Sequence, residues 1–483
     1  MDKKIAKNFI YSAAYQVLMA ILPLITAPYV ARVLRPEGNG IYSYTSSIAT
    51  VFALFAALGF SAYGQREVAY RQDDIEARST VFYEIVFFRI TTTLIATVAF
   101  IVFSLVYREY TSYLLPQVIS VIAVMFDISW YYQGLENFKI TVTRNFVIKA
   151  LSVACIFLLV KRPEHLGRYI AIMSLSVFLS NVIYMFHIKR NIVYVPWNTL
   201  HPLKHLKGTV EFFIPLIAVQ IYSHLDRIML GYLTPTAVEG GYYEQARKIT
   251  TIVVGLIISI NNVMMPRISK LYAQDDREQI IGFYRRTFKL LLLMLMPICA
   301  GLVLIADNFV LWFFGTEYAG VTPLVKLSAP LVVLMCIGNF VGIQYLSPTG
   351  QQNKMTRAYV IAAISNIALN AIMIPGRGAI GAMVASVIAE LISCGMQLYL
   401  LMNSEYRFSL LLGVWKYIAA SMVMIGSIML LHKLLSLTGI LSTCIDVISG
   451  ALVYTAMLLS VREENVTMLW RKMKSSVVRG CRN

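Results

Sequence analysis

Six of the arginines inside or at the ends of the apolar segments of this chain are candidates for a functional role, because a charge is costly there. They are Arg32, Arg66, Arg89, Arg227, Arg247 and Arg267. A charged side chain at the centre of a bilayer costs about 2.5–3.5 kcal/mol on insertion scales, so such residues usually face a wet interior. Guanidinium groups stay charged and match the geometry of phosphate oxygens. The six arginines therefore predict a cavity that binds an anion, with phosphate as the best-fitting group.

Two of these arginines belong to polar stripes with helical spacing. The stripe in segment 209–233 consists of Gln220, Ser223, His224 and Arg227. Their spacing of i, i+3, i+4 and i+7 places them on one face of a helix, where we expect them to line the cavity. Segment 241–266 repeats the spacing with Glu244, Arg247, Lys248 and Thr251. The candidates for ion coupling, or for pairing with the cations, are Asp127, Asp226 and Glu390.

The arginines outside the stripes have a simpler alternative explanation. Arg32, Arg66 and Arg267 each end a predicted span and could anchor that helix end at the membrane surface. Arg89 lies inside a span and could extend its charge to the interface or pair with Glu84. For the two arginines of the stripes we favour the cavity role.

The composition of the chain indicates a membrane protein. Of the 483 residues, 58% are apolar and only 14% are charged, whereas soluble domains are roughly 25% charged. We therefore predict an all-α membrane protein with about 14 transmembrane helices, because the segments are continuous apolar runs rather than short alternating strands. The segments run approximately over 9–31, 41–64, 81–106, 113–133, 142–160, 168–188, 209–233, 241–266, 287–308, 325–347, 356–375, 379–402, 412–433 and 440–461.

Lysine and arginine in the loops predict the orientation. With a cytoplasmic N-terminus, 27 of them fall at cytoplasmic ends and 8 in external loops. By the positive-inside rule both termini are cytoplasmic. The net charge of +17 then reflects topology and attraction to anionic membrane lipid, and we expect no nucleic-acid partner.

Several enzyme and cofactor signatures are missing from the sequence. The six cysteines form no CxxC pair, there is no phosphate-binding P-loop, and no external loop is long enough for a catalytic domain. His201 and His205 have metal-ligand spacing but no third ligand nearby. We predict no cofactor, no metal and no enzymatic activity. The stretch around these histidines is expected to lie on the membrane surface.

An internal repeat sets the predicted domain organisation. Gly40 and Gly241 are 201 positions apart, as are Arg66 and Arg267, and Pro23 and Pro215 occupy similar places in the two copies. Two similar bundles around a midplane cavity are typical of transporters, and matching prolines suggest hinges for alternating access. The predicted parts are an N-terminal six-helix lobe at 1–190, a cytoplasmic linker at 191–208, a second six-helix lobe at 209–402, and two extra helices with a basic tail at 403–483.

Several stretches of the sequence also resemble a known family. They are residues 28–44, 130–139, 144–145, 226–231, 265–269 and 344–348. In order and composition they resemble Wzx-type flippases, which transport O-antigen and capsule repeat units and form the polysaccharide transport family of the MATE-containing MOP superfamily. The resemblance implies two six-helix lobes plus two C-terminal helices in a bacterial cytoplasmic membrane. It also implies an undecaprenyl-diphosphate-linked glycan as substrate, and polymerase and other assembly proteins as partners.

The lipid II flippase branch of that superfamily is more distantly similar. Arg32 and Arg247 match the places of its functional arginines, but Tyr42 and Tyr44 stand where that branch has an acidic partner. We therefore expect a flippase that moves the lipid-linked unit from the inner to the outer leaflet by alternating access. The alternatives are a MATE-type cation or drug antiporter, which would favour acidic cavity residues, a membrane polysaccharide polymerase, and a non-transporting scaffold.

Overall fold

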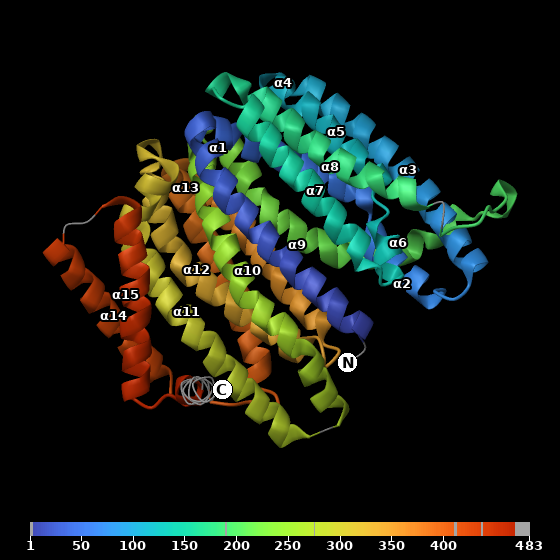
Figure 1. Ribbon diagram of the computed structural model, residues 1–483. Helices are drawn as coiled ribbons and strands as arrows, with labels where there is room; N and C mark the ends of the chain where they lie inside the picture. Colours follow the sequence, from blue (N-terminus) through green and yellow to red (C-terminus); the bar gives the residue numbers. More distant parts are fainter. Residues whose placement is uncertain (1–2, 189–190, 275, 410–412, 436–437, 469–483) are drawn as a thin grey trace, which may run out of the picture. The chain divides into compact units, whose positions relative to one another are not determined.

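A computed structural model describes residues 3–188, 191–274, 276–409, 413–435 and 438–468 (Figure 1). Across these ranges every regular element is helical. The chain forms two compact units, the first from residues 1–244 and 370–378 and the second from 245–369 and 379–483. The lobe and linker boundaries given in the sequence analysis are not the boundaries of these two units, and they stay a prediction. The predicted basic tail lies largely outside the described residues, because residues 469–483 are not among them.

The first unit contains nine α-helices and the first residues of a tenth. They are α1 (Lys3–Ala57), α2 (Phe60–Tyr70), α3 (Ile75–Val106), α4 (Thr111–Leu114), α5 (Val118–Ile122), α6 (Ser129–Gly134), α7 (Phe138–Leu159), α8 (Leu166–Ile188), α9 (Leu206–Leu233) and the start of α10 (Val238–Ala273). Helix α1 covers the first two predicted spans. Its break lies at Arg35, with φ 58° and ψ 174°. Arg35 precedes Pro36, and a residue before proline is disfavoured in the α conformation.

The second unit contains the rest of α10 and the C-terminal helices. They are α11 (Arg277–Phe314), α12 (Val321–Val341), a π-helix at Gly342–Leu346, most of α13 (Gln352–Met402), α14 (Val414–Leu435) and α15 (Gly439–Ser460). Helix α13 covers two predicted spans and is broken at Gly378, with φ 51° and ψ −132°. The positive φ suits glycine, which has no Cβ to clash in that conformation.

Nine helical stretches of the described residues are long and apolar enough to cross a membrane. One of them, Gln352–Met402, covers two predicted spans, and Leu24–Tyr70 covers the end of the first predicted span and all of the second. Predicted segments 142–160, 209–233 and 241–266 form α7, α9 and α10 but are not among the nine. The all-helical membrane architecture is thus confirmed, while the number of fourteen spans stays a prediction.

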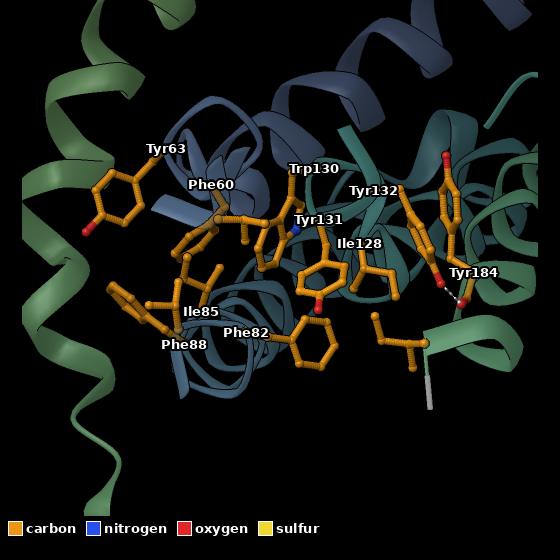
Figure 2. Packing of buried hydrophobic residues seen from close by; sticks show 13 residues of the cluster. Phe60, Tyr63, Phe82, Ile85, Phe88, Ile128, Trp130, Tyr131, Tyr132 and Tyr184 are labelled. Atoms are coloured by element: carbon orange, nitrogen blue, oxygen red, sulfur yellow. Dashed lines mark hydrogen bonds between the residues drawn. The ribbon is translucent and has the colours of Figure 1, made fainter. Parts of the chain in front are cut away.

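Aromatic side chains form a large part of the core of the first unit. Phe60 of α2, Trp130 and Tyr131 of α6 and Tyr184 of α8 are fully buried in one cluster (Figure 2). The hydroxyl of Tyr132 donates to the Tyr184 carbonyl oxygen at 3.1 Å, and the two rings stack. Figure 2 shows these side chains converging from separate helices. This packing fixes α2 and α3, which carry the predicted site residues Arg66 and Arg89.

The two copies of the repeat meet within the first unit. A Cβ added to Gly40 would lie 1.7 Å from the carbonyl oxygen of Ala237, and one added to Gly241 would lie 2.0 Å from that of Pro36. The offset of 201 converts Gly40 into Gly241 and Pro36 into Ala237, so each contact is the image of the other. Such reciprocal contacts are the mark of two-fold symmetry. A local two-fold axis therefore passes between the middle of α1 and the start of α10.

Candidate functional site

Three helices of the first unit meet around Arg227. Its Nε donates to Glu244 Oε2 at 2.7 Å, and its Nη1 donates to the Ser223 carbonyl oxygen at 3.1 Å. Ser43 Oγ donates to the same Glu244 oxygen at 3.1 Å. Ser43 and Glu244 are also separated by 201 residues, so this contact lies at the two-fold axis. We call Arg227, Glu244 and Ser43 the arginine cluster.

The arginine cluster is largely shielded from solvent. The side chain of Arg227 is 18% exposed and that of Glu244 is 12% exposed. Charge-assisted hydrogen bonds are stronger than neutral ones, and a shielded pair is screened little by salt. The sequence analysis placed Glu244 in the polar stripe of segment 241–266 without a partner, and the structure pairs it with Arg227.

The α9 stripe is part of one continuous helix, as the spacing predicted. Ser223 and His224 are half-buried on the same face as Arg227, whereas the side chain of Gln220 is exposed. Three residues after Glu244 on α10, Arg247 is half-buried and lies in the second unit. The cavity roles of these residues remain predictions.

Asp226 forms a second polar contact beside the arginine cluster. Its side chain is buried, and it accepts hydrogen bonds from the Tyr243 hydroxyl and, at 2.6 Å, from Asn370 Nδ2 of α13. The sequence analysis did not select Tyr243 or Asn370. The spacing of Asn366 and Asn370, one helical turn apart within an apolar segment, is the signal that would have indicated a buried polar face.

Arg89 and Asp127 are paired in the core of the first unit. Arg89 is 1% exposed; its Nη2 donates to Asp127 Oδ2 at 3.2 Å and its Nε to the Val124 carbonyl oxygen at 2.8 Å. Asp127 has an extended backbone (φ −77°, ψ 94°) that interrupts the helical segment and leaves carbonyl groups for side chains. The alternative pairing of Arg89 with Glu84 is wrong, because Glu84 bonds instead to the residues before α9.

Replacing Arg89 by alanine should lower the amount of folded protein more than the activity of each molecule. Removing one partner of a buried ion pair leaves an uncompensated charge and costs about 3–5 kcal/mol. Thermal unfolding of the detergent-purified variant would measure the loss. The double variant Arg89→Met/Asp127→Ala is the control, and it should recover part of the stability. A single variant with unchanged unfolding would contradict a structural role.

Three further predicted cations lie on α2, α10 and α1. Arg66 is 3.1 Å from Glu67 and its guanidinium lies 4.9 Å from the ring of Phe212. Arg267 is exposed and lies 5.8 Å from the ring of Phe283. Arg32 is exposed on α1. These surroundings agree with surface anchoring as readily as with anion binding, so the predicted role of all three residues is untested.

Glu390 belongs to a buried polar layer of the second unit. It is 7% exposed, and its Oε1 lies 3.6 Å from where a Cβ on Gly338 of α12 would be. The π-helix carries Gln344, whose Nε2 donates to Asn261 Oδ1 at 3.1 Å. Asn261 donates in turn to Asn339 Oδ1 at 3.0 Å. The sequence analysis did not single out these three amides, because isolated amides in apolar segments have no spacing pattern of their own.

Comparisons with known proteins place this architecture in a family. The family model described as "Polysaccharide biosynthesis protein" matches residues 5–272, which is more than half of the chain. The chain belongs to the polysaccharide biosynthesis protein family. A second model, described as "MatE", matches residues 212–372. The arginine cluster of this family member lies within the part that the first model covers.

Named relatives of this family member are transporters. The "Putative O-antigen transporter" of Shigella dysenteriae is 23% identical over 355 residues, covering 72% of this chain and 87% of the relative. The "Probable low-salt glycan biosynthesis flippase Agl15" of Haloferax volcanii is 24% identical over 242 residues, covering 49% of this chain and 50% of the relative.

Solved structures confirm the fold class. The inward closed conformation of the lipid II flippase MurJ matches with a TM-score of 0.76 at 15% identity, covering 94% of this chain and 99% of that one. An inward-facing multidrug resistance MATE transporter of the MOP superfamily matches with a TM-score of 0.60 at 13% identity, covering 80% and 97%. The predicted MATE/MOP-like fold is therefore correct.

Proposed function

We propose that this protein is a flippase that moves undecaprenyl-diphosphate-linked oligosaccharide repeat units from the inner to the outer leaflet of the cytoplasmic membrane. The product would supply a surface polysaccharide such as O-antigen, capsule or a teichoic acid-like polymer. The family and the names of its relatives support a glycan flippase of the MOP superfamily, a transporter and not an enzyme. The observation that carries the proposal is the shielded Arg227–Glu244 pair at the local two-fold axis.

The arginine cluster supports a diphosphate head group as the bound anion. A guanidinium can donate to two phosphate oxygens at once, whereas Glu244 accepts a single hydrogen bond from Arg227. A diphosphate also carries more negative charge than a carboxylate. An incoming diphosphate would therefore displace Glu244 from Arg227. The hydroxyl of Ser43 belongs to the same surroundings and can donate to a sugar or phosphate oxygen. An inside-negative membrane potential favours outward movement of the head group by about 2.3 kcal/mol per charge per 100 mV.

The second unit by itself contains an apolar cavity that would suit a lipid chain. It has a volume of about 690 Å³ and lies in the second unit, between α11, α14 and α15. Its lining includes Leu293, Pro297, Met424 and Gly450. An isoprenoid chain makes only apolar contacts, and most of the cavity lining is apolar. Alternating access of the two lobes would carry the head group across while the tail stays in the apolar phase.

Depletion of the protein should trap full-length lipid-linked oligosaccharide on the inner leaflet. The measurement is the amount of lipid-linked oligosaccharide in a depletion strain, with the leaflet assigned by a probe that cannot cross the membrane. Accumulated units that the probe cannot reach would support flipping, and their structure would identify the sugar. Units that still reach the outer leaflet at the normal rate would contradict the proposal.

A MATE-type cation or drug antiporter is the second candidate. The MatE family model covers residues 212–372, and the buried Asp226 is the type of group a cation would need. In this reading Asp226 would exchange its Tyr243 and Asn370 bonds for the cation. Increased drug resistance on overexpression, without accumulation of lipid-linked oligosaccharide on depletion, would favour the antiporter.

A further inference from the structure

The segment that precedes α9 is fastened to α3 along its length. We call residues 191–205 the strap. At its start, the Tyr131 hydroxyl donates to the Asn191 carbonyl oxygen at 2.6 Å. The backbone N–H of Val193 donates to Ser79 Oγ of α3 at 3.0 Å. Further along, the ring of Trp197 meets that of Phe87 of α3 edge-on at 6.0 Å. The sequence predicted a membrane-surface stretch here, and the structure adds this attachment to α3.

One carboxylate holds the far end of the strap. Glu84 of α3 is fully buried, and its Oε1 accepts the backbone N–H of His201 at 2.8 Å. Its Oε2 lies 2.8 Å from Lys204 Nζ and 3.0 Å from His205 Nε2. A buried carboxylate is costly unless it is paired and hydrogen-bonded, and here three groups of the strap satisfy it. Without the strap Glu84 would be an unpaired charge.

His205 extends this contact to α2. Its Nδ1 lies 2.8 Å from the Tyr63 hydroxyl. Because an ionised carboxylate only accepts hydrogen bonds, Nε2 carries the proton that faces Glu84, and Nδ1 accepts from Tyr63. Burial lowers the pKa of His205, and Glu84 opposes this effect only in part, so the ring is neutral near pH 7. Lys204 supplies the positive charge that pairs with Glu84. The other charged groups nearby are Arg66 and Glu67 of α2 and Arg71 directly after it.

The first turn of α9 is packed as closely as the strap. A Cβ on Gly208 would lie 2.2 Å from Cε2 of Tyr63, and one on Gly59 would lie 2.6 Å from the Thr209 carbonyl oxygen. Helix α9 begins at Leu206, directly after His205, and carries Arg227 on the same continuous helix. Fixing His205 therefore fixes where α9 begins.

We propose that Glu84 is a positioning residue for transport: it keeps the strap fastened to α3 throughout the cycle and so sets the position of α9 and its anion-binding arginine. The inference rests on the proposed flippase function. It implies that movement between the halves of the protein takes place beyond the first turn of α9, and not in the linker between the predicted lobes.

Two sets of variants test this role, with export measured per molecule of folded protein. Glu84→Ala removes all three contacts of the carboxylate and should reduce export at least tenfold, because loss of one charge-assisted hydrogen bond alone corresponds to about that factor. Glu84→Gln keeps an oxygen for the His201 N–H and should retain most of the export. The matched control is Glu76→Ala, an exposed carboxylate at the start of the same helix, which should export normally.

A covalent lock distinguishes a fixed strap from one that must detach. Ser79→Cys and Val193→Cys, in a background without the native cysteines, would be joined by oxidation or by a short bis-methanethiosulfonate. Locking the otherwise unchanged protein should leave export intact, and locking Glu84→Ala should restore it. Loss of export in the locked protein with Glu84 present would overturn the proposal, as would normal export by unlocked Glu84→Ala.

The lock keeps the test decisive where Glu84→Ala fails to fold, because the locked protein that retains Glu84 reports on the strap by itself. The unmodified protein serves as the reference for the proposed function. If that protein does not relieve accumulation of lipid-linked oligosaccharide in the depletion strain, the flippase proposal fails. If it does, and Glu84→Ala matches it, only the inference about the strap fails.

Discussion

Replacing Arg227 by alanine should abolish surface polysaccharide while the amount of membrane-inserted protein stays normal. The variant loses the guanidinium that we expect to hold the diphosphate, and a hydrogen bond to a charged group is worth about 1.5–3 kcal/mol. That range corresponds to roughly a tenfold to hundredfold loss of export at limiting substrate. The measurement is surface polysaccharide per molecule of folded protein, together with accumulated lipid-linked oligosaccharide. Arg247→Ala should behave similarly, and normal polysaccharide in both variants would contradict the anion-binding role.

The partner of Arg227 provides the control for this experiment. Arg227→Ala leaves Glu244 shielded with one cation fewer, which could inactivate the protein without any role in substrate binding. The double variant Arg227→Ala/Glu244→Gln removes both charges and keeps the site neutral. If the arginine binds the substrate, the double variant should remain inactive. Recovery of export in the double variant would mean that Arg227 serves only to neutralise Glu244.

The second large effect is expected at the contact between the two copies of the repeat. Gly40→Ala would place a methyl group 1.7 Å from the Ala237 carbonyl oxygen, and a backbone atom cannot rotate away as a side chain can. We expect a loss of about 3 kcal/mol, at the upper end of the usual cost of overpacking. By the local symmetry, Gly241→Ala should cost a similar amount against the Pro36 carbonyl oxygen. Thermal unfolding in detergent would measure both.

Gly167 of α8 is the matched control for the glycine variants. No heavy atom lies within 4 Å of a Cβ added there, and alanine is intrinsically favoured over glycine in a helix by about 1 kcal/mol. Gly167→Ala should therefore unfold at the same temperature as the native protein or a higher one. If Gly40→Ala and Gly167→Ala had equal midpoints, α1 and α10 would not be in close contact in the folded protein.

The sequence predicted those features that depend on local periodicity. Apolar runs of about 20 residues determine that the chain is helical and lies in a membrane. The helical period determines which side chains share a face, so Ser223, His224 and Arg227 were correctly placed on one side of α9. The offset of 201 was also visible in the sequence, and the structure places Gly40 and Gly241 in contact at that spacing.

Only the tertiary structure decided which polar groups meet. Arg89 pairs with Asp127 and not with Glu84, which is nearer in sequence, and Glu84 bonds to His205, 121 residues away. Helical periodicity specifies the face of a helix but not the neighbour that covers it, because the neighbour depends on where the chain turns between helices. For Asp127 that turn is a single extended residue. The helical periodicity of the sequence therefore predicts which side chains share a face of a helix. Which charged groups pair is decided by the packing of the helices.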